Sequence, residues 1–221
     1  MKDWKFNIDL ILKLHYSQGV DYQTPIGIKF VPFSPCFPTH SIEKWKDFRK
    51  EILNNKSFKH SLIWTGNPRI SSIKYIRQSV QNTLCNSKYG VSGFFEIDDY
   101  FQKSCQSLAS VGIHSLGEFC CREQEFMGLG IPYIHKGYKC ITHNIRLPNV
   151  HFLNYYDATE PNVEYFLNYF EPNGELKQFT QEEWDQYITI INNAKKWYDE
   201  NVAIHGSWKL LLAVLEQNNI I

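Results

Sequence analysis

The strongest constraint on the fold is a repeated order of short apolar strand, turn and amphipathic helix between residues 58 and 135. The segment 61–64 is apolar and ends before a Thr-Gly-Asn-Pro turn, after which isoleucines and a valine recur at helical spacing. Two further apolar strands, 111–113 and 131–134, are separated by a helical segment, 118–129. Because strands joined by helices pair in parallel, this order predicts a doubly wound α/β sheet in which the three strands are neighbours.

Helical patterns also occur between these strands and in the C-terminal tail. Apolar residues at helical spacing predict a helix through Ile97, Phe101, Cys105 and Leu108, and Thr180 to Glu183 form a capping box. We expect the two apolar stripes of the tail to pack into the core. Their members are Trp184, Tyr187, Ile188, Ile191, Ala194 and Tyr198 in the first stripe, and Ile204, Trp208, Leu211, Leu212 and Leu215 in the second.

The N-terminal part has a different pattern of apolar residues. Two apolar stretches, 8–14 and 26–31, have the partly alternating pattern of strands. A proline-rich turn follows, and a helix is expected over residues 41–54, with Ser41 as its N-cap and Glu43 in its first turn.

Composition excludes several classes of protein. The 221 residues include 23 basic and 23 acidic side chains, so we expect neither a broad nucleic-acid surface nor a polybasic membrane patch. No apolar run approaches the roughly 20 residues that span a bilayer, and the first residues lack a signal-peptide core. The six cysteines form no Cys-x-x-Cys pair, which favours reduced thiols and a cytoplasmic location.

In open α/β sheets, ligands bind beyond the carboxyl ends of the strands, which selects the loop after residue 64. Gly66 lets the backbone approach a ligand there, and the following helix offers free N–H groups to an anion. Arg69 and Lys74 could neutralise a diphosphate. A plain turn before a solvated helix is the alternative, since neither a Walker pattern nor G-x-G-x-x-G occurs.

The same rule selects the loop and helix after residue 113. His114 and Ser115 follow the buried strand directly. Glu118, Arg122 and Glu125 are spaced four and three residues apart, so they share one helical face. A surface ladder of ion pairs is the alternative, but this helix starts where a site is expected.

These residues carry a resemblance. Ser115 and Glu118 form a Ser-x-x-Glu motif, and residues 125–134 read Glu-Phe-Met-Gly-Leu-Gly-Ile-Pro-Tyr-Ile. This pattern resembles the donor-site signature of GT-B glycosyltransferases, which is Ser-x-x-Glu followed by Glu-Ala-Met-Ala-x-Gly-x-Pro-Val-Ile. Glu125, Gly130 and Pro132 fall at matching spacings.

The resemblance covers residues 60–135 in the family's order, and Arg69 with Lys74 resembles its basic pair for the donor diphosphate. It implies a Rossmann-like, nucleotide-sugar-binding domain with C-terminal helices over residues 58–221. Residues 1–57 would then be a reduced segment on the acceptor side. A partner chain or a second copy could supply the acceptor site.

The implied function is transfer of a sugar from a nucleotide-diphosphate sugar to a glycan or other acceptor. By resemblance, Glu125 holds the ribose hydroxyls and Glu118 lies near the donor sugar or its phosphates. Arg69 and Lys74 supply positive charge for the leaving diphosphate, so no metal or other cofactor is expected. Gly66, Ser115 and Arg122 are further candidate residues for binding the donor. His114 is a candidate general base.

Two alternatives remain open. The first is a noncatalytic nucleotide-sugar-binding module derived from such a donor lobe, and the second is another α/β enzyme. Asp98 and Asp99 do not make an Asp-x-Asp metal motif, and we expect them to begin a helix and to carry surface charge.

Overall fold

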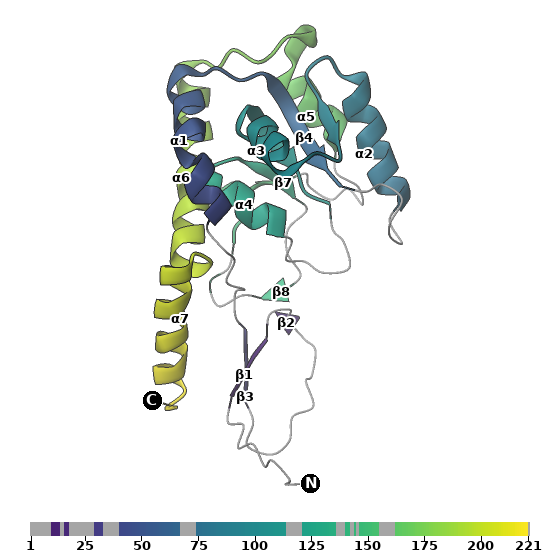
Figure 1. Cartoon of the computed structure of the whole chain (residues 1–221). Helices are drawn as coiled ribbons and strands as arrows, with labels where there is room; N and C mark the ends of the chain where they lie inside the picture. Colours follow the sequence, from purple (N-terminus) through teal and green to yellow (C-terminus); the bar gives the residue numbers. More distant parts are fainter. Residues whose placement is uncertain are drawn as a thin grey trace.

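A five-stranded sheet with all its strands parallel lies at the centre of the computed structural model (Figure 1). Its strands follow the spatial order β5-β4-β6-β7-β9. They are β4 (His60–Thr65), β5 (Val91–Gly93), β6 (Ser107–Val111), β7 (Tyr133–His135) and β9 (Leu153–Asn154). The structure describes residues 10–13, 16–17, 29–32, 40–66, 74–113, 121–135, 140–141, 144, 146–154 and 162–220.

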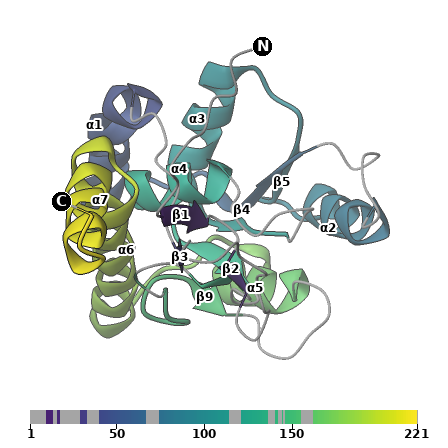
Figure 2. The same ribbon diagram turned by 90° about the horizontal axis from the view of Figure 1, so that it is seen from below.

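Helices flank both faces of the sheet. Figure 2 shows α3 and α4 on one side and α5 on the other, with α1, α6 and α7 grouped along one edge. The helices are α1 (His40–Asn55), α2 (Lys74–Asn86), α3 (Ile97–Cys105), α4 (Cys121–Leu129), α5 (Val163–Phe170), α6 (Gln181–Asn201) and α7 (Ile204–Gln217), with a 3₁₀ turn at Pro172–Gly174. The predicted parallel α/β sheet with helices on both faces is therefore confirmed.

The strand order explains why the helices divide between two layers. The chain moves from β4 outward to β5 and then returns across β4 to β6, so the direction of winding reverses between these connections. Since crossovers between parallel strands are right-handed, the reversal places α2 and α3 on opposite faces. One hydrophobic core accordingly joins α2 and α5, and a second joins α1, α3 and α4. Helix α6 contributes to both, through Tyr187 and Ile191 in the first and Trp197 and Tyr198 in the second.

A buried arginine on α1 links several of these elements. Arg49 is 1% exposed and donates hydrogen bonds to the carbonyl oxygens of Cys105, Ser107 and Gly130. Two of these carbonyls lie at the C-terminal ends of α3 and α4, where the helix dipole is negative. The arginine charge is therefore stabilised by main-chain oxygens.

Two short strand pairs lie apart from the central sheet (Figure 1). β1 (Leu10–Lys13) pairs in parallel with β3 (Lys29–Pro32), and both fall in the predicted N-terminal stretches. β2 (Tyr16–Ser17) pairs antiparallel with β8 (Cys140–Ile141). Helix α1 lies before the predicted domain boundary at residue 57 and packs on α3 and α4, and the boundary itself stays a prediction.

Several local predictions are confirmed. Thr180 and Glu183 form the capping box at the start of α6. Gly130 ends α4 in the left-handed conformation (φ +70°), which glycine adopts without strain. Asp98 and Asp99 lie in the first turn of α3, paired with Lys44 at 2.6 Å and Lys103 at 3.0 Å.

Other boundaries were predicted wrongly. α1 begins at His40, so Ser41 lies inside the helix and is not its N-cap. Leu108 belongs to β6, because α3 ends at Cys105 and the strand begins two residues later. The predicted strand 111–113 overlaps β6 only at its last residue, Val111.

The largest error concerns the second stripe of the tail. Trp208 is 61% exposed and Leu212 is 49% exposed, and Ile204 is also exposed. The buried residues of α7 are instead Gly206, Ser207, Leu210 and Val214. At the start of α7, Gly206 lies so close to the end of α6 that a Cβ there would meet the Asp199 carbonyl oxygen, so this position needs glycine.

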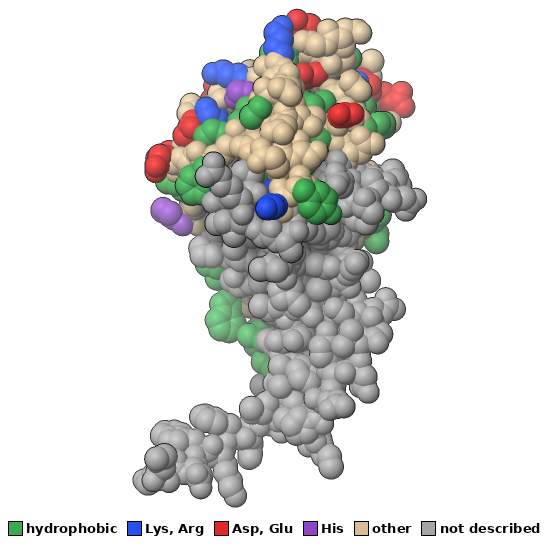
Figure 3. Space-filling view, turned by 90° about the vertical axis from the view of Figure 1, so that its right-hand side faces the viewer, with side chains coloured by type: hydrophobic (Ala, Val, Ile, Leu, Met, Phe, Trp, Pro, Cys, Tyr) green, Lys and Arg blue, Asp and Glu red, His purple; other side chains and the backbone are tan. Residues whose placement is uncertain are grey.

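The surface of the described part mixes both signs of charge, with acidic and basic side chains interspersed in Figure 3. None of the helices in that part is both long and apolar enough to span a bilayer. Cys85 and Cys105 are free thiols, and burial raises the pKa of Cys105 to about 11, so this thiol stays protonated.

Candidate functional site at the carboxyl end of the sheet

The reversal of strand order opens a crevice between the carboxyl ends of β4 and β6. Ligands of doubly wound sheets bind at such a reversal, because the connections leave in opposite directions and no helix covers the gap. A small cavity of about 80 Å³ lies here. It is lined by Trp64, Thr65 and Gly66 from β4 and its exit, Val111, Gly112 and Ile113 from β6 and its exit, Arg77 from α2, and Arg122, Glu123 and Phe126 from α4.

Two arginines from different helices line the cavity. Arg77 lies on α2, which follows β4, and Arg122 lies in the first turn of α4, which follows β6. The Arg122 guanidinium donates a hydrogen bond to the main-chain carbonyl of Thr65. This bond uses one of five guanidinium donors, so the group can also bind an anion.

Two of the residues that line the cavity are glycines, Gly66 and Gly112, and each lies close to neighbouring atoms. A Cβ at Gly112 would lie 3.0 Å from the Ile134 carbonyl oxygen and 3.1 Å from the His135 ring. A Cβ at Gly66 would lie 2.9 Å from the Trp64 ring and 3.4 Å from an Arg122 nitrogen. A side chain at either position would crowd these neighbours, so both glycines preserve the space at the strand ends.

A buried acid–histidine pair lies against the same cavity. His135 is the last residue of β7, and its Nε2 lies 3.4 Å from Oε1 of Glu123 on α4. Both side chains are almost fully buried, and the imidazole packs edge-on against Phe152. The pair fixes α4 to the carboxyl end of β7 and sets the position of Glu123 on the cavity wall.

Glu125 lies on α4 and contacts α3. Its carboxylate accepts a hydrogen bond of 2.8 Å from the Tyr100 hydroxyl in the first turn of α3. Burial raises the pKa of Glu125, and the Tyr100 hydrogen bond and the nearby Arg122 charge oppose this rise. The cavity lining given by the described residues includes Glu123 and not Glu125.

The sequence-predicted site residues are placed as follows. Gly66 and Arg122 line the cavity, and Lys74 is an exposed residue at the start of α2. Glu125 is not among the described lining residues, and its carboxylate bonds to Tyr100 of α3. Predictions for the other four lie outside the described residues: Arg69, His114, Ser115 and Glu118.

Three residues of this site were missed by the sequence analysis. Arg77 could have been found, because it lies one helical turn after Lys74 and therefore on the same face. Glu123 and His135 carried no signal of their own, since nothing in the spacing shows that α4 begins above the end of β7. Within the described part of the chain, no three His, Cys, Asp or Glu side chains gather as metal ligands would.

Comparison of the chain with known protein families, with curated protein sequences and with solved structures finds no match. The resemblance to GT-B glycosyltransferases therefore rests on the sequence motifs alone.

Proposed function

We propose that this protein is a glycosyltransferase that binds a nucleotide-diphosphate sugar in the crevice between β4 and β6. The observation that carries the proposal is the placement of Arg77 and Arg122, from two different helices, at the point where the strand order reverses. Two guanidinium groups match a dianionic diphosphate, and each can bind phosphate oxygens in a fork geometry.

The chemistry follows from the charge that develops on the leaving group. A departing nucleotide diphosphate gains negative charge in the transition state, and positioned cations stabilise it without a metal. Arg122 is held by Thr65 before any ligand arrives, so its guanidinium needs little reorganisation. In this proposal, Arg69 and Lys74 add charge from the first loop and the start of α2.

The roles of the remaining residues come from the resemblance. Glu125 would accept two ribose hydroxyls, and it lies on the same helix as Arg122, three residues farther along. Glu118 would lie near the donor sugar or its phosphates, and Ser115 belongs to the same Ser-x-x-Glu motif. His114 is the candidate general base because of its predicted position at the strand exit.

Calorimetry with UDP, GDP and ADP tests the binding step, and turnover of the corresponding nucleotide sugars tests the reaction. We expect one diphosphate to bind and its sugar conjugate to be hydrolysed or transferred. Glu125→Ala should weaken binding of that nucleotide about tenfold to a hundredfold, the range expected for hydrogen bonds to a charged group. Equal affinities for wild type and Glu125→Ala would exclude the ribose role.

The same measurements decide the main alternative, a noncatalytic module that binds nucleotide sugars. Such a module would bind the diphosphate and its sugar conjugate without turnover. Failure of all three diphosphates to bind would reject both readings.

A further inference from the structure

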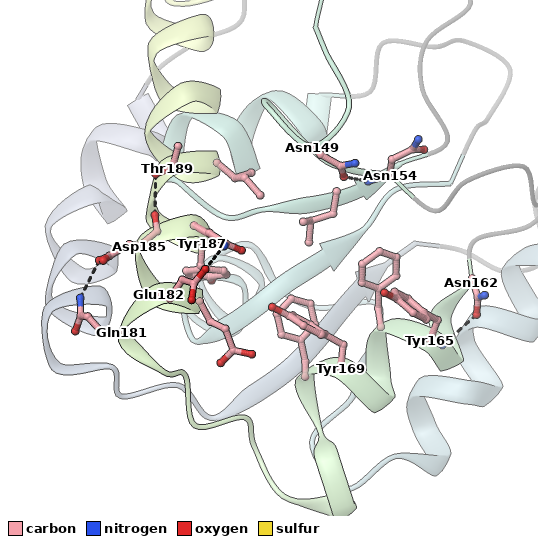
Figure 4. Close-up of a pocket in the computed structure, with 16 residues that line it drawn as sticks. Asn149, Asn154, Asn162, Tyr165, Tyr169, Gln181, Glu182, Asp185, Tyr187 and Thr189 are labelled. Carbon is pink, nitrogen blue, oxygen red and sulfur yellow. Dashed lines mark hydrogen bonds between the residues drawn. The ribbon is translucent and has the colours of Figure 1, made fainter.

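A second, much larger concavity lies between α5 and α6, on the side of the sheet near β9. Its volume is about 1150 Å³, which is enough for an oligosaccharide or a short peptide. Leu153 of β9 and Tyr187 of α6 are among its lining residues, and Figure 4 shows the side chains that surround it. We call this concavity the α5–α6 groove.

One wall of the groove presents tyrosine rings. Tyr165 and Tyr169 lie one helical turn apart on α5 and are 60% and 39% exposed. Their neighbours Phe166 and Phe170 are buried in the core below, so the helix is held while the tyrosine rings stay accessible. Accessible rings on a fixed helix suit a ligand with flat apolar faces and polar edges.

The opposite wall and the upper end carry amides and a hydroxyl. Asn162 uses its carbonyl oxygen to cap α5, accepting from the Tyr165 N–H at 3.0 Å, and its NH₂ group remains a donor. Gln186 donates to Glu182 at 3.5 Å, which leaves its carbonyl oxygen as an acceptor. The Thr189 hydroxyl donates to the Asp185 carbonyl and can still accept.

The charge of the groove selects against anions. Glu182, Glu183 and Asp185 contribute carboxylates, and the described residues that line the groove include no lysine, arginine or histidine. Glu183 is neutralised by Lys177 at 2.8 Å, and this ammonium also lies 4.4 Å from the Tyr169 ring. The other two carboxylates each accept a hydrogen bond from a glutamine of α6, Glu182 from Gln186 at 3.5 Å and Asp185 from Gln181 at 2.8 Å. The groove therefore offers carboxylate, amide and hydroxyl groups to a ligand.

We propose that the α5–α6 groove binds a neutral oligosaccharide. Sugar rings have apolar C–H faces that stack on tyrosine, and hydroxyl edges that pair with amides and carboxylates. Asn154 at the end of β9 and Asn162 at the start of α5 place the upper part of the groove at the carboxyl edge of the sheet. Since neighbouring strands are about 4.8 Å apart, β9 lies about 10 Å from β6.

Because of this spacing, the α5–α6 groove is suited to bind the acceptor of the proposed reaction. An oligosaccharide seated in the groove could extend along the carboxyl edge to the crevice between β4 and β6. Its identification as the acceptor rests on the proposed function, whereas the binding of the oligosaccharide does not.

Calorimetry on the full chain with chitotriose, cellotriose and mannotriose tests the groove, with trigalacturonate as an anionic probe. We expect at least one neutral trisaccharide to bind at millimolar concentration and trigalacturonate to bind more weakly. Tyr165→Ala should weaken that binding about tenfold, the usual scale for removing an aromatic anchor. Tyr165→Phe keeps the ring and should retain most of the affinity.

The matched control is Tyr75→Ala, because Tyr75 is 62% exposed on α2 and does not line the groove. Binding of no neutral trisaccharide, or equal binding by wild type and Tyr165→Ala, would overturn the proposal. Preference for trigalacturonate would also overturn it. Tyr165-dependent binding of a trisaccharide by a chain that binds no nucleotide diphosphate would uphold the groove and reject the glycosyltransferase.

Discussion

The guanidinium of Arg122, in the first turn of α4, donates a hydrogen bond to the main-chain carbonyl of Thr65 at the end of β4. The bond joins the two strand exits that frame the crevice, because α4 follows β6. It also fixes a positive charge on the wall of the small cavity at the strand ends. Arg122 therefore serves both the local structure and the proposed site.

Replacing Arg122 separates these two contributions. Arg122→Ala should weaken binding of UDP, GDP or ADP, whichever the wild type binds, about tenfold to a hundredfold. Binding of the matching nucleoside should change little, because it carries no phosphate. Arg122→Lys keeps the charge but loses the fork geometry. Its affinity for the nucleotide, measured by calorimetry, should therefore lie between those of the wild type and Arg122→Ala.

Lys196→Ala is the control for a general loss of positive charge, because Lys196 is exposed on α6. Its nucleotide affinity should equal that of the wild type. An equal loss for Lys196→Ala and Arg122→Ala would mean that only net charge matters.

Glu125 predicts a dependence of stability on pH. Burial raises its pKa above the ordinary value of 4.5, so the folded state favours the protonated carboxyl. Its favourable contribution to stability is complete below pH 4.5 and is lost as pH rises through the raised pKa. Glu125→Gln should therefore gain stability relative to wild type as pH rises from 4 to 7. Urea unfolding at pH 4 and pH 7 measures the stability difference between Glu125→Gln and the wild type. An advantage of Glu125→Gln that instead grows as the pH falls would contradict the assignment.

Arg49 should be among the residues whose loss most reduces stability. Arg49→Ala leaves the carbonyls of Cys105, Ser107 and Gly130 without this donor inside the protein. Each buried acceptor left unsatisfied costs about 1–3 kcal/mol, so we expect the free energy of unfolding to fall by at least about 3 kcal/mol.

The neighbouring Lys50 is exposed on the same helix, and Lys50→Ala should change stability by less than about 0.5 kcal/mol. Urea denaturation of both variants gives the comparison. Similar stabilities for Arg49→Ala and Lys50→Ala would show that the buried network contributes little.

The orientation of α7 can be tested with two leucines of one helix. Leu210 is buried and Leu212 is 49% exposed. Leu210→Ala should lower the free energy of unfolding by about 2–3 kcal/mol, and Leu212→Ala by less than about 1 kcal/mol. A larger loss of stability for Leu212→Ala than for Leu210→Ala would show that the face predicted from the sequence is the buried one.

The α7 result shows why the sequence could predict the existence of this helix but not its orientation. Ile204, Trp208 and Leu212 follow helical spacing, and so do Leu210 and Val214, which are the buried pair. Two apolar faces on one helix give no preference until the neighbouring surface is known. Here the close approach of Gly206 to the end of α6 helps to set which side of α7 is buried in its first turn.

The strands of the sheet that could be predicted from the sequence are those that form continuous apolar segments. β4 and β7 lie in such segments, whereas β5 reads Val-Ser-Gly and β9 reads Leu-Asn, which are too short for a periodic signal. These two strands form the edges of the sheet, and backbone pairing with β4 and β7 defines them.

The residues of the candidate site also differ in whether the sequence could predict them. Gly66 was predicted because it follows a strand directly, and Arg122 because it shares a helical face with Glu118 and Glu125 on the helix after the next strand. Glu123 and His135 meet only through the packing of α4 above β7, which no local pattern encodes.

The most direct test of the central claim is the mapping of nucleotide binding by amide chemical shifts in the full chain. UDP, GDP and ADP are titrated in turn into the ¹⁵N-labelled protein. We predict that one diphosphate shifts the amides of residues 64–66, 111–113 and 122–123, around the crevice. Shifts confined to the α5–α6 groove, or no saturable shifts with any of the three, would contradict it.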